Sequence, residues 1–234
     1  MNIFNNGTFA LFKGHCVYKD VAFDYEFFIN PSKMNIEQSY LYKSDLIYRF
    51  GNQMVPEFID KDAPLPRSSD RHKQHRPIQV DKKVICLDRT RKIVKNGLNN
   101  NLYDAIGFVK NTLTGDQSSC SLQYRDYYDV GTPQLWVCDL CRVSGDIKSP
   151  ISPTLTLFYV IDMLAVSANI DYVYLMVYKK TNTHNSLVKR YTDIYNFVIA
   201  EDSPVFGINV YTFMKKSLHN FIPIVPCPLT QQAF

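Results

Sequence analysis

The residue of this sequence best suited to acid–base chemistry is a carboxylate set in an apolar strand. Asp139 lies within residues 135–143, whose alternation predicts a β-strand with Asp139 on the same face as Val137 and Cys141. A carboxylate that is buried in such a strand without a partner has a raised pKa, which suits a general base. The side chain can equally lie hydrogen-bonded on an open face, and the sequence leaves both interpretations open.

Two of the six cysteines flank this aspartate. Cys138 and Cys141 have the CxxC spacing of many zinc and redox sites, but a structural zinc ion takes four ligands and the sequence has no second CxxC or HxxxH pair. Residues three apart on a regular strand point to opposite faces, so the two thiols are not expected to converge. We therefore expect no metal site, and reduced thiols that pack as small apolar side chains.

Positive charge is concentrated in one stretch of the chain. Residues 61–95 contain eleven Lys or Arg and four Asp, a balance of +7, whereas the whole chain carries +4. Such a segment suits a polyanion or an acidic protein partner, through electrostatic attraction and counterion release. A solvated charged loop explains it equally well. The stretch has no Phe, Tyr or Trp, so stacking on single-stranded bases is not expected.

The composition is that of a folded protein with a sizeable core. The chain has 234 residues, of which 46% are hydrophobic and 21% are charged. It has neither the apolar run of a membrane span nor the features of a signal peptide, so we expect an intracellular protein, in cytoplasm or nucleus. Frequent Asn, Tyr, Ile and Lys with few Gly and Ala residues is the usage of an AT-rich genome, such as that of a large DNA virus or an endosymbiont.

The first half of the chain predicts mostly strands. Residues 8–29 are rich in aromatic and β-branched side chains that partly alternate, with Gly14 as a break between the first two runs. Residues 36–50 have apolar residues at helical spacing. Residues 51–77 hold four prolines around a polar string and predict a surface loop or insertion. Three further stretches predict strands, namely residues 80–88, 106–113 and 122–128.

The second half predicts a strand, a helix and a strand in that order. Ser152 suits an N-cap and Pro153 the first turn of a helix that runs to Ala168, and apolar residues recur along one face of it. Residues 172–178 are apolar on both faces, as in a central parallel strand. Because parallel neighbours need a crossover, residues 135–143 and 172–178 should be parallel, splayed apart at one end and joined by this helix. A helix over 183–195 and a strand over 205–216 complete the segment.

The order of strands and helices over residues 135–216, together with one short signature, is similar to that of the GNAT acyl-CoA N-acyltransferases. The family's signature is Asn, two residues, Ala, two residues, Leu-Tyr, three residues, Gly-Phe. In NSLVKRYTDIYNF, Asn185 and Phe197 match the family's Asn and Phe. Thr192 replaces the Tyr, and Asn196 replaces the Gly, which is a reasonable exchange where a positive φ is needed.

A second family motif opens the central helix, and there the sequence departs from it. The motif falls on Ile147, Pro150 and Ser152, and none of the three is the family's residue. The resemblance therefore rests on residues 135–216. It implies an α/β fold with a mixed, GNAT-like sheet, formed by a single domain over residues 1–234.

The resemblance implies acetyl-CoA as the cofactor and an amine as the acceptor. The pantetheine arm would pair with the backbone of the strand predicted over residues 135–143. The pyrophosphate would meet the N-terminus of the helix that begins at Pro153. Pro150 lacks the N–H that a family glycine offers there, so side chains must replace it. The implied cofactor contacts are Leu140, Cys141, Val143, Lys148, Ser149, Ser152, Thr154 and Asn185.

The resemblance also implies a base and an acid for amide formation. Asp139 is the candidate base. Thr192 stands at the position of the family's acid tyrosine, and Tyr191 reaches the same place if the register shifts; a role as a core aromatic explains Tyr191 equally well.

Two functions of different classes remain open. The first is an acyl-CoA-dependent N-acetyltransferase whose acceptor is not readable from the sequence. The second is a catalytically inactive GNAT-like protein that serves as a binding or structural component. Contact with a polyanion through residues 61–95 is compatible with either. A rise in melting temperature on addition of acetyl-CoA would separate the two.

Overall fold

The computed structural model describes residues 3–5, 7–51, 82–99, 102–126, 132–143, 150–180, 182–200, 210–222 and 231–232. The strands in these residues are β1 (Ala10–Tyr18), β2 (Val21–Ile29), β3 (Ala105–Asn111), β4 (Gln117–Arg125), β5 (Gln134–Val143), β6 (Tyr172–Tyr178), β7 (Val198–Ile199), β8 (Tyr211–Ser217) and β9 (Gln231–Gln232). The helices are α1 (Ile36–Gln38), α2 (Ser44–Gly51), α3 (Lys82–Asn99), α4 (Pro153–Ser167) and α5 (His184–Tyr195).

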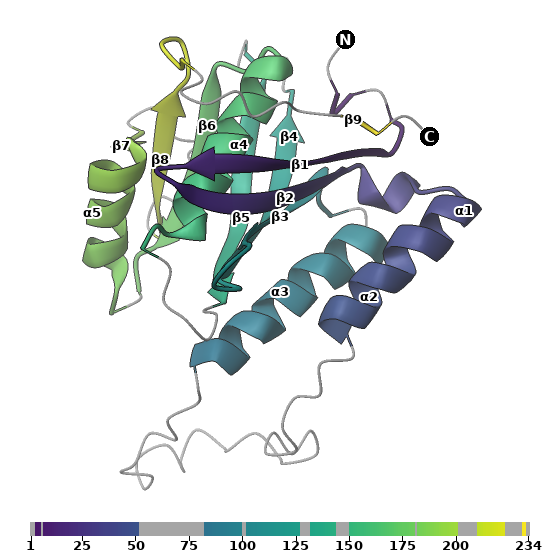
Figure 1. The fold of residues 1–234 in the computed structure, drawn as a ribbon. Helices are drawn as coiled ribbons and strands as arrows, with labels where there is room; N and C mark the ends of the chain where they lie inside the picture. Colours follow the sequence, from purple (N-terminus) through teal and green to yellow (C-terminus); the bar gives the residue numbers. More distant parts are fainter. Residues whose placement is uncertain are drawn as a thin grey trace, which may run out of the picture.

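The strands described above form one mixed sheet in the order β7-β8-β6-β5-β4-β3-β2-β1-β9 (Figure 1). All neighbours are antiparallel except β5 and β6, which are parallel. The α/β class with a mixed sheet is thereby confirmed. No helix in the described ranges is long and apolar enough to cross a membrane.

The N-terminal hairpin is confirmed, but its turn lies elsewhere than expected. β1 and β2 pair along their whole length and turn at Lys19 and Asp20, both in the left-handed region with φ of 49° and 63°. Gly14 does not break the segment, because it lies inside β1 opposite Tyr25. A side chain at this position would collide with the tyrosine ring, so the glycine serves a close approach.

The strand predicted over residues 80–88 is wrong, because residues 82–99 form helix α3. Ile93, Val94 and Leu98 recur at helical spacing and are buried against the sheet with Ile106. Gly97 belongs to this helix rather than to a turn, and a side chain there would collide with Ile106. The burial of Ile93, Val94 and Leu98 outweighs the weak strand tendency of residues 80–88.

The helix predicted over residues 36–50 is confirmed as α1 and α2, joined by a π-helical turn at Ser39–Lys43. The helical spacing rested partly on Ile36 and Tyr40, but these two are exposed, whereas Leu46 is fully buried, so the expected residues do not form the buried face. The expected loop over residues 51–77 begins with the last residue of α2 and otherwise lies outside the described residues. The first residues of the strand predicted over residues 205–216 also lie outside the described residues, and β8 begins at Tyr211.

The strand–helix–strand unit is confirmed. Ser152 caps α4, its Oγ accepting a hydrogen bond from the Thr154 N–H at 3.3 Å, and Pro153 opens the helix. β5 and β6 pair only over Gln134–Val137 and Tyr172–Leu175, so they part beyond those residues. The positive φ expected at the end of α5 is also confirmed, with φ of 61° at Asn196.

Helix α4 lies at the centre of the molecule. Figure 1 shows β1 and β2 passing in front of it, so that the curled sheet surrounds the helix on several sides. Leu157 and Ile161 are fully buried in one large cluster with Phe23 and Phe27 of β2 and Val173 of β6. Fully burying each such side chain stabilises the fold by about 1.5–3 kcal/mol. A polar residue on the buried face of this helix therefore has little access to water.

Candidate functional site

A cavity opens where β5 and β6 part, and we refer to it as the β5–β6 slot. Its volume is about 370 Å³, and its walls come from β5, β6, α3 and α5. Ile93 of α3 belongs to the apolar cluster on one side of the sheet, and Tyr191 of α5 packs on the cluster of the other side. The slot is therefore reached by helices from both faces. Its lining residues are Arg89, Lys92, Ile93, Val137, Cys138, Asp139, Leu140, Cys141, Leu175, Met176 and Tyr191.

A β-bulge decides which way the side chains of the slot point. In the register of β4 and β5, Ser121 faces Asp139 and Leu122 faces Val137, so Cys138 is an extra residue. Leu122 and Val137 belong to the α4-side cluster. Ser121, the neighbour of Leu122 on β4, points to the other face, and Asp139 shares that face with it. The expectation that Asp139 lies on the face of Val137 is therefore wrong.

The same bulge brings Cys138 and Cys141 to one face, against the alternation expected of a regular strand. Cys141 lies opposite Ser119, whose hydroxyl is 2.9 Å from the hydroxyl of Thr90 on α3. Burial raises the pKa of the Cys138 thiol to about 12, so this thiol stays protonated at neutral pH. Within the described ranges, no group of three or more His, Cys, Asp and Glu residues is placed to hold a metal.

Asp139 is held through one of its two oxygens. Its Oδ2 accepts hydrogen bonds from the hydroxyls of Tyr103 at 2.6 Å and Ser121 at 2.9 Å. Burial, followed by the contact with Asp139, raises the pKa of Tyr103 to about 12, so the tyrosine remains a donor. Oδ1 accepts no hydrogen bond from the residues that the structure describes, and the residue is exposed. Of the two interpretations of the sequence, the hydrogen-bonded carboxylate on an open face is confirmed.

The two other residues implied as catalytic lie in different places. Tyr191 lines the slot, and its ring packs edge-on against Phe158 and Phe197, so it is both a slot wall and a core aromatic. Thr192 is exposed and outside the slot, with its hydroxyl donating to the Val188 carbonyl at 3.1 Å. One residue along a helix is a rotation of about 100°, which turns Thr192 away when Tyr191 faces inward.

The implied cofactor contacts are only partly brought together. Leu140 and Cys141 line the slot, whereas Val143 ends β5 beyond it. Asn185 is exposed at the start of α5, where its Oδ1 lies 3.0 Å from Nδ1 of His184. It too lies outside the slot.

At the start of α4 the implied anion donors are already engaged within the protein. Thr154 is buried with its hydroxyl 2.7 Å from that of Ser118, and Ser152 caps the helix. Lys148 and Ser149 lie outside the described residues, so their roles stay predictions.

Sequence reasoning missed four residues of the site. Tyr103 and Ser121 anchor Asp139, and Arg89 and Lys92 bring two cations to the slot from α3. The signal for the cations was present in the helical spacing of residues 89–98, where no helix was predicted because a strand was expected just before them, over residues 80–88. Tyr103 and Ser121 gave no local signal. Ser121 meets Asp139 through the pairing of β4 with β5, and Tyr103 meets it through a contact between segments far apart in the chain.

Solved structures show a distant likeness. An acetyltransferase of the GNAT family from Listeria monocytogenes is 11% identical, with a TM-score of 0.40 over 87% of this chain and 99% of that one. Arabidopsis thaliana Naa50, solved with the bisubstrate analogue CoA-Ac-MVNAL, is 15% identical, with a TM-score of 0.34 over 48% and 72%. The NatC complex, solved with Gag peptide and CoA, is 10% identical, with a TM-score of 0.34 over 82% and 98%. No protein-family model and no curated protein sequence matches. At this distance the site has to be understood from its own geometry.

Proposed function

We propose that this protein transfers an acyl group from acyl-CoA to an amine in the β5–β6 slot. The observation that carries the proposal is the parted end of the parallel strand pair. There a bulge presents Asp139 beside a ligand-sized cavity, with one carboxylate oxygen anchored and the other available. A base has to be held in position and still reach its substrate, and this arrangement meets both needs.

The slot fits the pantetheine arm of acetyl-CoA better than it fits the phosphates. Beyond Val137 and Leu175 the facing edges of β5 and β6 do not pair with each other, so the backbone groups of Leu140 and Cys141 on that edge suit the amides of the arm. The first N–H groups of α4 are used internally, that of Leu155 bonding to the Ser152 carbonyl at 2.9 Å. The phosphates would then depend on Lys148 and Ser149.

The residues of the slot offer one proton acceptor and one hydrogen-bond donor to the transfer. Acetyl-CoA would supply the acetyl group as a thioester, whose C–S bond breaks as the new C–N bond forms. Oδ1 of Asp139 would accept the proton that the acceptor amine loses. Burial raises the pKa of Tyr191 to about 12, so its hydroxyl stays protonated and would donate a hydrogen bond to the departing thiolate, which would then take up a proton from water.

The charges on α3 favour an acceptor that carries an anionic group near its amine. Arg89 and Lys92 are exposed and line the slot on the side from which Asp139 is reached. The acceptor's amino group would meet Asp139 while a carboxylate or phosphate of the same molecule met the two cations. Acceptors with an acidic group should therefore react faster than neutral or dibasic amines of the same size.

The test combines binding with turnover. Calorimetry should show acetyl-CoA binding to the wild-type protein, and release of free thiol should follow when an amine is added. Asp139→Asn should lower the turnover by roughly 10²–10⁴-fold, the usual contribution of a general base, and leave the heat of binding unchanged. Asp193→Asn, an equivalent change at an exposed position of α5, should alter neither. Absence of both heat and stabilisation at millimolar acetyl-CoA would exclude the enzyme.

A second candidate function is a non-catalytic binding or structural protein of the same fold. It is favoured by the engaged hydroxyls at the start of α4 and by aromatic rings that fill the space between α4 and α5. Phe158 lies 4.7 Å from Tyr195 and 6.2 Å from Tyr191, measured between ring centres. Pull-down of a partner by a protein that fails to bind acetyl-CoA would support this alternative.

Contact with a polyanion remains a prediction. Residues 61–81 lie outside the described residues, but the part of the basic stretch on α3 exposes Arg89, Lys92 and Lys95 at three-residue spacing. Heparin or DNA binding should fall steeply as salt is added. Replacing Arg71, Lys73 and Arg76 with Ala should weaken it without unfolding the protein.

A further inference from the structure

Three cations follow one another on the exposed side of α3, and we refer to them as the cationic row. They are Arg89, Lys92 and Lys95, and all three side chains are exposed. No ion pair or hydrogen bond joins them to any residue that the structure describes. Within the described part of the chain, the cationic row therefore holds nothing in the fold.

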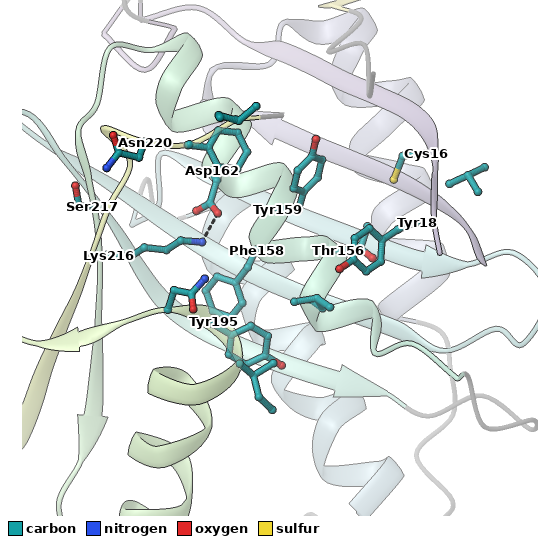
Figure 2. Close-up of a pocket in the computed structure, with 16 residues that line it drawn as sticks. Cys16, Tyr18, Thr156, Phe158, Tyr159, Asp162, Tyr195, Lys216, Ser217 and Asn220 are labelled. Carbon is teal, nitrogen blue, oxygen red and sulfur yellow. Dashed lines mark hydrogen bonds and ion pairs between the residues drawn. The ribbon is translucent and has the colours of Figure 1, made fainter. Parts of the chain in front are cut away.

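Other cations of the molecule are used inside the fold. Arg49 of α2 is paired with Glu26 of β2 at 2.8 Å. The ammonium group of Lys216 is paired with buried Asp162, as the dashed line in Figure 2 shows. An anion from outside would have to compete with these carboxylates, whereas it meets no competing carboxylate among the described residues at the cationic row. The unpaired row is the stronger candidate for an anion-binding surface.

The cationic row begins in the β5–β6 slot and leads out of it. Arg89 and Lys92 line the slot, whereas Lys95 is not part of its lining. Six residues of helix correspond to about 9 Å along the axis, and each step of three residues turns the side chain back by about 60°. A small acceptor with one anionic group would meet only the first two cations. The third cation favours an acceptor that extends out of the slot and carries further anionic groups.

The chemistry of the slot narrows the class of this acceptor. Amide formation needs a neutral amine, and an α-amino group, with a pKa of about 8, loses its proton more readily than a lysine side chain, with a pKa of about 10.4. Nucleic acids carry anions but no aliphatic amine, and a polyamine would be repelled by the cationic row. A peptide that begins with an α-amine and continues with acidic side chains has both groups. An extended chain rises about 3.3 Å per residue, so three residues span the row.

We propose, on the basis of the function proposed above, that the acceptor is the N-terminus of an acidic peptide. Its α-amine lies at Asp139, and the acidic side chains that follow lie over the cationic row. The thioester C–S bond breaks, a C–N bond forms to the α-nitrogen, Asp139 takes the proton of the amine, and the thiolate takes up a proton from water. The contacts with the row join exposed charges, so each is weak and is screened by salt.

Three peptides of equal length test the proposal. They are Ala-Glu-Glu-Glu-Gly-Tyr and its counterparts with three Gln or three Lys residues in place of the three Glu, each assayed with acetyl-CoA by release of free thiol. The KM of the acidic peptide should be roughly tenfold lower than that of the Gln peptide at low salt, as expected for three weak ion pairs. The Lys peptide should have the highest KM, and added salt should narrow the differences.

The outcomes separate this inference from the function on which it rests. Equal KM values for the three peptides, or reaction of free glutamate but of no peptide, would overturn the inference and leave the acyltransferase intact. Absence of thiol release with every amine would overturn both. A DNA oligonucleotide of equal charge tests the other class of polyanion. If it inhibits more strongly than the acidic peptide with an acetylated N-terminus, the cationic row is a nucleic-acid site and the proposal is wrong.

Variants locate the acidic side chains. Lys95→Gln should raise the KM of the acidic peptide roughly two- to threefold and leave kcat unchanged, because it removes one weak ion pair at a distance from the reacting atoms. The KM of the Gln peptide should stay the same. Lys13→Gln, at an exposed position of β1, removes the same charge on the far side of β2, β3 and β4 and should alter neither KM. Melting temperatures show that both variants are folded. An unchanged KM for the acidic peptide in Lys95→Gln would contradict its placement along α3.

Discussion

Two aspartates show how differently this fold treats a carboxylate. Asp139 is exposed at the β5–β6 slot, with two hydroxyl donors on one oxygen. Asp162 is 2% exposed, and one oxygen is paired with an ammonium group while the other has no partner among the described residues. The first is open to a molecule that enters the slot, which is what the proposed function requires of it. The second is costly to bury and depends on Lys216. The comparison teaches that the neighbours of a carboxylate, rather than its place in an apolar segment, decide its chemistry.

The largest expected effect comes from breaking the buried pair. Lys216→Met leaves Asp162 buried without its cation and should reduce the free energy of unfolding by roughly 3–5 kcal/mol. Lys189→Met breaks an exposed pair with Asp193 and should cost less than about 1 kcal/mol. Urea denaturation measures both. The double change Asp162→Leu with Lys216→Met should recover most of the loss, and a Lys216→Met variant as stable as Lys189→Met would contradict this account.

The buried carboxylate should also make stability depend on pH. Burial outweighs the attraction of Lys216 and raises the pKa of Asp162 to about 6 from an ordinary value of 3.8. Between these values the folded protein holds a proton that the unfolded chain has lost, so this contribution to stability is complete below the lower value and is lost as the pH rises through about 6. At about 1.4 kcal/mol per unit the loss is roughly 3 kcal/mol. Urea midpoints across this range should show the step in the wild type and not in Asp162→Asn.

The anchoring of Asp139 should have a smaller effect on stability. Tyr103→Phe removes the 2.6 Å hydrogen bond to the carboxylate and should cost about 1.5 kcal/mol, the lower end for a bond to a charged group, since Asp139 is exposed. If Asp139 is the base, turnover should fall as well because the carboxylate is less well oriented. Tyr40→Phe, at an exposed position, is the matched control. An unchanged urea midpoint for Tyr103→Phe would mean that the bond does not hold the site.

The smallest effect is expected at Asn196, the residue that follows α5, the helix that contributes Tyr191 to the slot. Asn196 has a φ of 61°, which Ala adopts less readily than Asn or Gly. Asn196→Ala should destabilise the protein by about 1 kcal/mol, whereas Asn196→Gly should change stability by only a few tenths. Thermal unfolding compares the two. Equal melting temperatures for both variants would argue against the left-handed conformation.

The sequence by itself determined the elements whose signals are local. Ser152 and Pro153 mark the start of α4, Asn196 marks the end of α5, and the crossover between β5 and β6 follows from their order along the chain. Asp139 was found for the same reason, as a charge in an apolar strand. Asp162 gave a comparable signal, a charge within an apolar helix, but it was not among the predicted site residues.

Only the tertiary structure decided what those residues do. The bulge at Cys138 depends on the pairing of β4 with β5, and it turns Asp139 to the face opposite the one that alternation predicts. α3 replaced a predicted strand because its apolar stripe packs on the sheet. The partner of Asp162, Lys216, arrives from β8, 54 residues later along the chain. Local propensity is set by neighbours in the chain, whereas the face, the burial and the partner of a charged group are set by segments that meet only after folding.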